Sequence, residues 1–285
     1  MTMTVLLGAV AYDPKVVTIW FGFREWLRKH DLDFDFILYS NYERQAEDLV
    51  AGRIDVAWNS PLAWLRCERL AAARGLTVTA LLMRDTDQDL TSVFVVRADS
   101  RYQTLADLKG ARVALGAIDS PQATLIPLAA LADAGLLPGC GLGVTRFDVG
   151  VGLHGDHIGG ERDAVRALLD GRVDAAAIID ANHLGFGRDG TIPAGSVRII
   201  GQTTPFDHCN LTVVDTAPAD EIEKLRELLE SMSYDDETVR PLLDLEGLTR
   251  WVPGRTSGYE VLDTAVDLVG FYDAAGNVTA TDYRP

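Results

Sequence analysis

One six-residue pattern occurs twice in this chain, and the repetition restricts the folds that the chain can adopt. Residues 52–57 read Gly-Arg-Ile-Asp-Val-Ala, and residues 171–176 read Gly-Arg-Val-Asp-Ala-Ala. In each copy an amphipathic segment precedes the glycine, which suits the left-handed position that ends many helices. The apolar residues after the glycine predict a short buried strand. We therefore expect two similar halves, each containing a helix–glycine–strand unit.

Polar residues follow both predicted strands. Asn59 and Ser60 come after the first strand, and Asp180 comes after the second. In open parallel sheets, ligands bind beyond the carboxyl ends of the strands, so the repeat predicts two lobes that face one cleft. The alternative is that the pattern is an ordinary junction between a helix and a strand and that the two halves are unrelated.

Composition limits the class of protein and its partners. A chain of 285 residues with 47% hydrophobic content can bury a full core. Its formal net charge of −16 argues against a nucleic-acid partner, because such binding depends on Lys and Arg. The same charge does not suit an anionic membrane surface. We expect a small-molecule ligand, no nucleic acid and no insertion into a membrane.

Features of the sequence that bear on location favour a reducing compartment. The apolar segment 5–10 is too short for a signal peptide, and no stretch is long enough to span a bilayer. Cys67, Cys140 and Cys209 are widely spaced and odd in number, so a disulfide framework is not expected. The sequence as written predicts a cytoplasmic protein, or a periplasmic or extracellular one if a signal sequence was removed.

The order of predicted elements indicates an α/β fold with largely parallel sheets. Two β-branched runs, residues 91–96 and 210–214, have no helical period and are interpreted as crossover strands between the lobes. We expect the first lobe to comprise residues 1–96 and 205–285, and the second lobe residues 97–204. Each lobe is expected to be Rossmann-like.

Three motifs carry a resemblance to a known family. Asp-Leu-Lys-Gly at 107–110 opens the second lobe, a strand-to-helix turn contains Ser120, and an amphipathic helix ends in the second copy of the repeat. This arrangement, over roughly residues 5–215, resembles the phosphate- and phosphonate-binding components of ABC transporters, which are type II periplasmic binding proteins. The resemblance implies two lobes, a small polar solute in the cleft between them, and an ABC permease as partner if the chain is exported.

The chain departs from the family pattern at two points. The family usually has several hydroxyl residues in a row at the turn where this chain has Ser120 followed by Pro, Gln and Ala, so only Ser120 carries over. An anion-contacting histidine of the family falls on or near Glu161. Fewer hydroxyls and an added carboxylate both weigh against a dianionic phosphonate as the ligand.

Polar side chains at strand ends and crossovers form the candidate ligand-binding set. Its members are Tyr12, Asn59, Ser60, Ser120, Gln122, His154, His157, Glu161, Asp180 and His208. Within this set, His154, His157 and Glu161 have the residue types of a divalent-metal site, the one cofactor that the sequence suggests. Hydrogen bonding to a solute and a purely structural role are the alternatives for these three. No catalytic residue is assigned.

Two functions from different classes fit these features. The first is a solute-binding protein that closes by hinge motion on its ligand. The second is a cytoplasmic enzyme on the same fold, such as a lyase, decarboxylase or biosynthetic synthase, metal-dependent through His154, His157 and Glu161. A catalytic pair of Cys209 and His208 is not favoured, because adjacent residues in a strand point to opposite faces. A cytoplasmic sensor is the third alternative.

Overall fold

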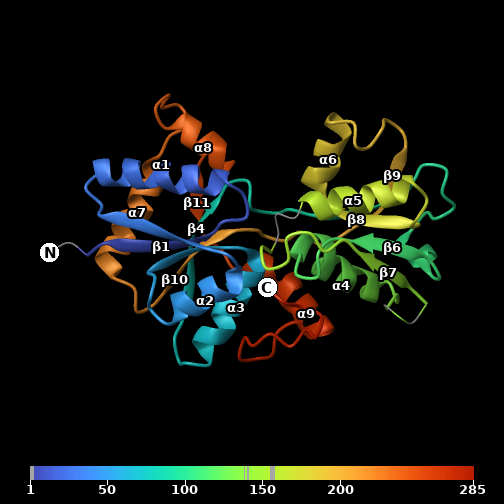
Figure 1. Cartoon of the computed structure of the whole chain (residues 1–285), viewed down its shortest axis with the longest axis horizontal. Coiled ribbons are helices and arrows are strands. Elements are labelled where there is room, and N and C mark those ends of the chain that lie inside the picture. The colour runs from blue at the N-terminus through green and yellow to red at the C-terminus, as the bar shows by residue number, and fades with distance from the viewer. Residues whose placement is uncertain (1–2, 138, 140, 155–157) are drawn as a thin grey trace.

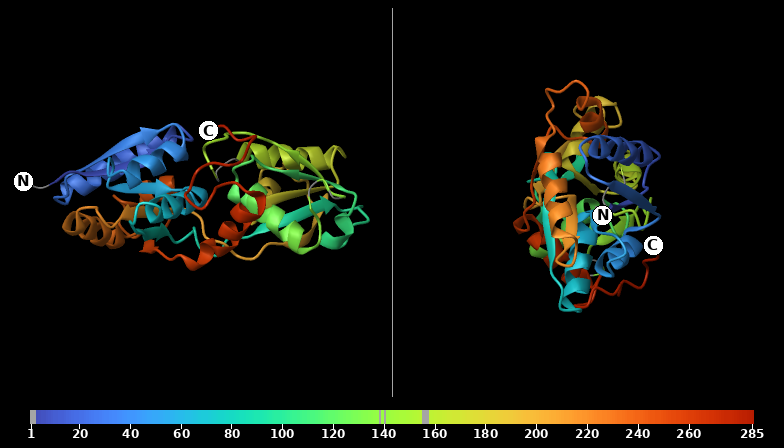
Figure 2. Two further views of the ribbon diagram at one scale, coloured as in Figure 1. Left: turned by 90° about the horizontal axis from the view of Figure 1, so that it is seen from below. Right: turned by 90° about the vertical axis from the view of Figure 1, so that its left-hand side faces the viewer.

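The structure is a computed structural model and describes residues 3–137, 139, 141–154 and 158–285. Two lobes lie side by side along the longest axis of the molecule (Figure 1). The N-terminus is at the far end of the first lobe, and the C-terminus is near the junction of the lobes. The left view of Figure 2 shows the same elongated arrangement from below, and the right view looks along the longest axis.

The first lobe is built on a six-stranded mixed sheet. Its strands, in order, are β11 (Trp251–Pro253), β4 (Val78–Arg84), β10 (Asn210–Val214), β3 (Val56–Asn59), β1 (Val5–Val10) and β2 (Phe34–Tyr39). The strands β2, β1 and β3 are parallel, and β10 is antiparallel to both β3 and β4. The carboxyl ends of the three parallel strands therefore meet at one edge of the sheet.

The second lobe repeats this plan with five strands. Their order is β7 (Gly143–Arg146), β6 (Arg112–Leu115), β8 (Ala175–Ile179), β5 (Ser92–Arg97) and β9 (Val197–Gln202). Here β7, β6 and β8 are parallel, and β5 is antiparallel to β8 and β9. Each lobe thus has three parallel strands followed by one antiparallel strand, which confirms that the halves are similar.

The repeated hexapeptide has the same structural role in both lobes. Gly52 and Gly171 adopt left-handed backbone angles, with φ of 68° and 72°, after the helices that they end. Asp55 accepts a hydrogen bond of 2.8 Å from a backbone N–H of β1, and Asp174 accepts one of 2.8 Å from a backbone N–H of β6. The repeated glycine therefore ends a helix, and the repeated aspartate fixes the neighbouring central strand.

Helices cover both faces of each sheet. In the first lobe, α1 (Lys15–Lys29), α7 (Ala219–Ser231) and α8 (Arg240–Glu246) pack on one face, and α2 (Tyr42–Val50) and α3 (Pro61–Ala72) pack on the other. In the second lobe, α5 (Ile158–Leu169) and α6 (Asp180–Arg188) lie opposite α4 (Ile126–Asp133) and the short η1 (Leu105–Leu108). Among the described residues, no helix combines the length and the apolar character that a bilayer span requires.

The sheets divide the chain differently from the division expected from the sequence. Residues 92–96 were expected in the first lobe, but they belong to β5, which pairs with β8 and β9 of the second sheet. A buried β-branched run has the same appearance in either sheet, so its partners could not be read from the sequence. We propose that the chain crosses between the lobes at residues 85–91 and 203–209.

The C-terminal residues contact both lobes rather than the first lobe alone. Only β11 joins the first sheet. The helix α9 (Glu260–Val269) and Phe271 share an apolar cluster with α3 of the first lobe and α4 of the second. Figure 1 shows α9 at the junction of the lobes. This cluster buries apolar side chains of both lobes in one core.

Gly160, in the first turn of α5, provides a test of how closely α5 packs in the second lobe. A Cβ atom at Gly160 would lie 2.6 Å from the carbonyl oxygen of Phe147, whereas one at Gly185 in α6 would meet nothing within 4 Å. We expect Gly160→Ala to lower the free energy of unfolding by about 1–3 kcal/mol. The control Gly185→Ala should leave it unchanged or raise it by up to about 1 kcal/mol. Equal stabilities of the two variants in urea denaturation would contradict this packing.

Candidate functional site

A cavity of about 480 Å³ lies between the lobes, next to the points where β1, β4 and β8 end. Its volume is in the range typical of small-molecule sites. Polar side chains from both lobes line it: Tyr12, Lys15, Arg84, Asp87 and His208 from the first lobe and the crossovers, and Gln122 and Asn182 from the second. A larger cavity of about 560 Å³ is formed by α1 and residues 231–242 of the first lobe alone, away from these strand ends.

A buried ion pair forms the first-lobe wall of the cavity. Arg84, the last residue of β4, donates to both carboxylate oxygens of Asp87, with Nε–Oδ2 of 2.6 Å and Nη2–Oδ1 of 2.8 Å. Arg84 also donates to the backbone oxygen of Glu246 in α8 at 2.8 Å. Asp87 is only 1% exposed, so this bidentate pair neutralises a carboxylate that would be costly to bury alone.

His208 and Cys209 lie together beside this ion pair. The His208 Nδ1 atom is 3.1 Å from Cys209 Sγ and 3.6 Å from Asp87 Oδ1. The expectation that these adjacent side chains point to opposite faces was wrong. Both residues precede β10, which begins at Asn210, so the alternation of a strand does not apply to them.

The second-lobe wall begins at the turn after β6. Ser120 is fully buried, and its Oγ accepts a hydrogen bond of 3.2 Å from the backbone N–H of Ala123. Gln122 lines the cavity and lies 3.5 Å, Nε2 to Oε1, from the buried Glu161. Glu161 also accepts a hydrogen bond of 2.9 Å from the backbone N–H of Ile179, the last residue of β8. Glu161 therefore joins α5 to the end of β8 behind the cavity.

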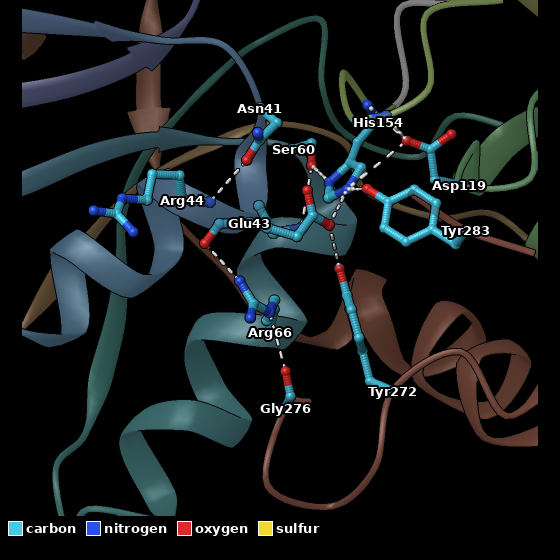
Figure 3. A network of polar contacts seen from close by, with 12 residues as sticks. Asn41, Glu43, Arg44, Ser60, Arg66, Asp119, His154, Tyr272, Gly276 and Tyr283 are labelled. Atoms are coloured by element: carbon cyan, nitrogen blue, oxygen red, sulfur yellow. Dashed lines mark hydrogen bonds and ion pairs between the residues drawn. The ribbon is translucent and has the colours of Figure 1, made fainter. Parts of the chain in front are cut away.

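A second polar group, centred on His154, joins the two lobes directly (Figure 3). His154, from the loop before α5, is 1% exposed. Its Nε2 atom lies 2.8 Å from Glu43 Oε1 in α2, and its Nδ1 atom lies 3.0 Å from Ser60 Oγ at the start of α3. Asp119 of the second lobe has its Oδ2 atom 3.9 Å from the same Nε2. We call these residues, with the tyrosines described next, the His154 network.

The C-terminal segment completes the His154 network. The hydroxyl of Tyr283 is 3.2 Å from His154 Nε2, and the hydroxyl of Tyr272 donates to Glu43 Oε1 at 3.2 Å. Arg66 of α3 donates to the backbone oxygen of Gly276 at 3.0 Å. Both tyrosines are almost fully buried. The first lobe, the second lobe and the C-terminal segment are therefore tied together at one buried point.

Electrostatics within the network favour an ionised Glu43. Burial alone would raise the pKa of Glu43, but the charge interaction with His154 and the hydrogen bonds to the carboxylate lower it to about 2. Burial, together with the negative charge of Glu43, raises the pKa of Tyr272 and Tyr283 above the usual value of 10. Both phenols therefore stay protonated and able to donate.

The predicted residues fall into separate surroundings. Tyr12, Gln122 and His208 line the cavity, whereas Ser60 and His154 belong to the buried network. Asn59 and Asp180 have partners elsewhere: Asn59 donates to Thr212 Oγ1 at 2.8 Å, and Asp180 accepts from Thr91 Oγ1 at 2.9 Å. Whether any of the predicted residues contacts a solute stays a prediction.

The predicted metal site at His154, His157 and Glu161 also stays a prediction. His157 lies outside the described residues. His154 is in contact with Glu43 and Ser60, while Glu161 contacts Ile179 and Gln122. The described members of the set therefore have separate protein partners.

Several residues of the cavity and of the network are not among the predicted site residues. Arg84 and Asp87 follow the strand-end rule that identified Asn59 and Asp180, so that signal was available. Glu43 lies in the first turn of α2, and Tyr283 is the third residue from the C-terminus. No local pattern distinguishes these two from ordinary surface residues.

Comparisons with known proteins agree with the observed fold. A family model described as the periplasmic substrate-binding protein of ABC phosphonate transporters matches residues 9–259. PhnD1 from Prochlorococcus marinus MIT 9301, solved with methylphosphonate, has a TM-score of 0.70 at 15% identity, covering 95% of this chain and 99% of its own. A Xanthomonas citri protein bound to ATP has a TM-score of 0.67 at 18% identity, covering 96% of each chain.

A third structure has the same fold. A binding-protein component of an ABC phosphonate transporter from Pseudomonas aeruginosa gives a TM-score of 0.62 at 13% identity, covering 99% of this chain and 91% of its own. At such identities the likeness establishes the fold alone, and that fold is the expected type II periplasmic binding protein. The alternative of an enzyme on this fold receives no support from these matches.

The lowered pKa of Glu43 predicts how stability depends on pH. A carboxylate whose folded pKa lies below its ordinary value of 4.5 stabilises the fold above pH 4.5, and this contribution is lost as pH falls toward 2. We expect Glu43→Gln to remove on the order of 3 kcal/mol of stability at neutral pH and to flatten the loss of stability between pH 4.5 and 2. The control Glu237→Gln is at an exposed position and should leave the stability and its pH dependence unchanged.

Urea denaturation over this pH range is the measurement. Parallel curves of stability against pH for the wild-type protein and Glu43→Gln would contradict the role that we assign to the pair of Glu43 and His154.

Proposed function

Because this chain belongs to the family of periplasmic substrate-binding proteins of ABC phosphonate transporters, we propose that it binds a small polar solute in the cavity of about 480 Å³ between its lobes. The observation that carries this proposal is the position of the cavity. It lies at the ends of β1, β4 and β8, where both lobes supply hydrogen-bonding side chains. Ligands of open α/β sheets bind at this position.

The charges around the cavity favour a solute without a large net charge. Asp13 and Asp87 bring two negative charges, and Lys15 and Arg84 bring two positive ones. The Arg84 charge is already neutralised by its bidentate pair with Asp87. Complementarity of charge therefore favours a zwitterion or a neutral polar molecule over a dianion.

The two serines at helix starts already form hydrogen bonds within the protein. Ser60 and Ser120 each accept a hydrogen bond from a backbone N–H in the first turn of the following helix, at 3.1 and 3.2 Å. Both side chains are buried. We infer that contacts to a solute come from other cavity-lining side chains, such as those of Tyr12, Gln122 and Asn182. This supports the expectation from sequence that simple phosphonates bind weakly.

The partner that we propose is the permease of an ABC transporter. The family consists of the substrate-binding components of such transporters, and its members are periplasmic. Two structures of the same fold contain the anionic ligands methylphosphonate and ATP. Anion binding is therefore the alternative that a ligand screen must include.

A thermal-shift screen with zwitterionic amino acids, aromatic acids, phosphate and methylphosphonate tests the proposed class of solute. A solute at a hundredfold excess over its dissociation constant should stabilise the folded protein by about 2.7 kcal/mol. We expect zwitterions to produce the largest shifts and methylphosphonate to produce little or none. Micromolar binding of methylphosphonate would contradict the charge argument but would leave solute binding itself intact.

A matched pair of variants in α6 tests the position of the site. Asn182 lines the cavity, whereas Leu184 is 61% exposed and does not line it. Asn182→Trp should fill the cavity and weaken solute binding at least about tenfold, while Leu184→Trp should change it by less than about twofold. Equal affinities of the two variants would place the solute elsewhere.

A further inference from the structure

Three metal-ligating side chains converge at the first-lobe wall of the cavity. The ligand atoms of Asp87, His208 and Cys209 all lie within 4.8 Å of one another, and all three side chains are buried. In the parts of the chain that the structure describes, this is the one group of three such donors. We propose that Asp87, His208 and Cys209 form a binding site for a divalent metal ion of the zinc type.

The distances between the donors are close to those of tetrahedral coordination. Zinc binds sulfur at about 2.3 Å and nitrogen or oxygen at about 2.0–2.2 Å, so its ligand atoms lie about 3.3–3.8 Å apart. The Nδ1 atom of His208 is 3.6 Å from Asp87 Oδ1 and 3.1 Å from Cys209 Sγ. The 3.6 Å distance lies in this range, the 3.1 Å distance is slightly shorter, and all three ligand atoms lie within 4.8 Å of one another.

The same geometry argues against a catalytic Cys–His–Asp arrangement. In such a triad one ring nitrogen of the histidine faces the nucleophile and the other faces the carboxylate. Here a single atom, His208 Nδ1, faces both Cys209 Sγ and Asp87 Oδ1. Donors that converge on one point describe a coordination site rather than a relay of protons.

The charges around the site favour a cation of charge +2. Arg84 contributes one positive charge, and Asp87 and Glu246 contribute two negative ones; the Glu246 Oε1 atom is 3.5 Å from Arg84 Nη1. Metal binding deprotonates a coordinating cysteine, which adds a third negative charge from Cys209. The sum is then −2, which a divalent ion neutralises.

Arg84 uses only part of the hydrogen-bonding capacity of the Asp87 carboxylate. A carboxylate has about four lone-pair sites, and Arg84 uses two of them. Hydrogen bonds from a neighbouring group commonly fix the orientation of a metal-bound carboxylate. In this arrangement Arg84 holds Asp87 in place, with Oδ1 of Asp87 3.6 Å from Nδ1 of His208.

The backbone around the site is also held in place. The N–H of His208 donates to the carbonyl oxygen of Asp87 at 2.7 Å, and the hydroxyl of Tyr259 donates to the carbonyl oxygen of His208 at 2.8 Å. Because Asp87 and His208 line the cavity, a fourth coordination position would open toward it. Thiolate and imidazole ligands together favour zinc over magnesium or calcium.

The first test measures metal binding by the full-length protein. After dialysis against a chelator, the protein would be titrated with Zn²⁺ and analysed by inductively coupled plasma mass spectrometry. We expect one retained zinc ion per chain. With Co²⁺ in place of Zn²⁺, thiolate ligation should produce a sulfur-to-cobalt charge-transfer absorption in the near ultraviolet. Failure to retain zinc, or bound cobalt without this absorption, would overturn the proposal.

Variants then locate the site. Cys209→Ser and His208→Gln should each weaken zinc binding by about 10- to 100-fold or more. The control Cys67→Ser removes the other described cysteine, which lies in α3 and contacts Asn59 instead. Circular dichroism would show that each variant is folded. Zinc binding that is unchanged in a folded Cys209→Ser variant, or lost in Cys67→Ser, would overturn the assignment of the site.

Discussion

The pairing of His154 with Glu43 is the central buried polar contact between the two lobes. The pair joins a loop of the second lobe to a helix of the first, and both side chains are almost fully buried. Removing one partner would leave the other without its compensating contact, which makes such pairs costly to break. Tyr272 and Tyr283 attach the C-terminal segment to the same pair, so one point of contact organises three parts of the chain.

The His154 network and the cavity lie on different sides of the sheets. The His154 network includes residues of α2 and α3, whereas the cavity lies beside the starts of α1 and α6. Figure 1 shows α2 and α3 on one side of the sheets and α1 and α6 on the other. The turn after β6 serves both, because Asp119 belongs to the network and Gln122 lines the cavity. The protein thus holds its lobes together on one side while keeping space for a solute on the other.

Much of the fold could be predicted from the sequence, because its strongest signals are local. The repeated glycine and aspartate act within a few residues of a helix end and a strand start, so they identified both halves and the strand ends. The partners of β5 and the position of Tyr283 depend on pairings between distant segments. Adjacent residues can also mislead, because His208 and Cys209 precede β10 and do not alternate as strand residues do.

Small-angle X-ray scattering of the ligand-free protein is the most direct test of the lobe arrangement. We predict that wild-type scattering fits two lobes in contact through the His154 network, and that His154→Ala, which removes the contacts with Glu43 and Tyr283, increases the radius of gyration. Ser60→Ala keeps the pair of His154 and Glu43 and should produce a smaller change. Wild-type scattering that requires separated lobes, or identical curves for the wild-type protein and a folded His154→Ala variant, would contradict the central role of this contact.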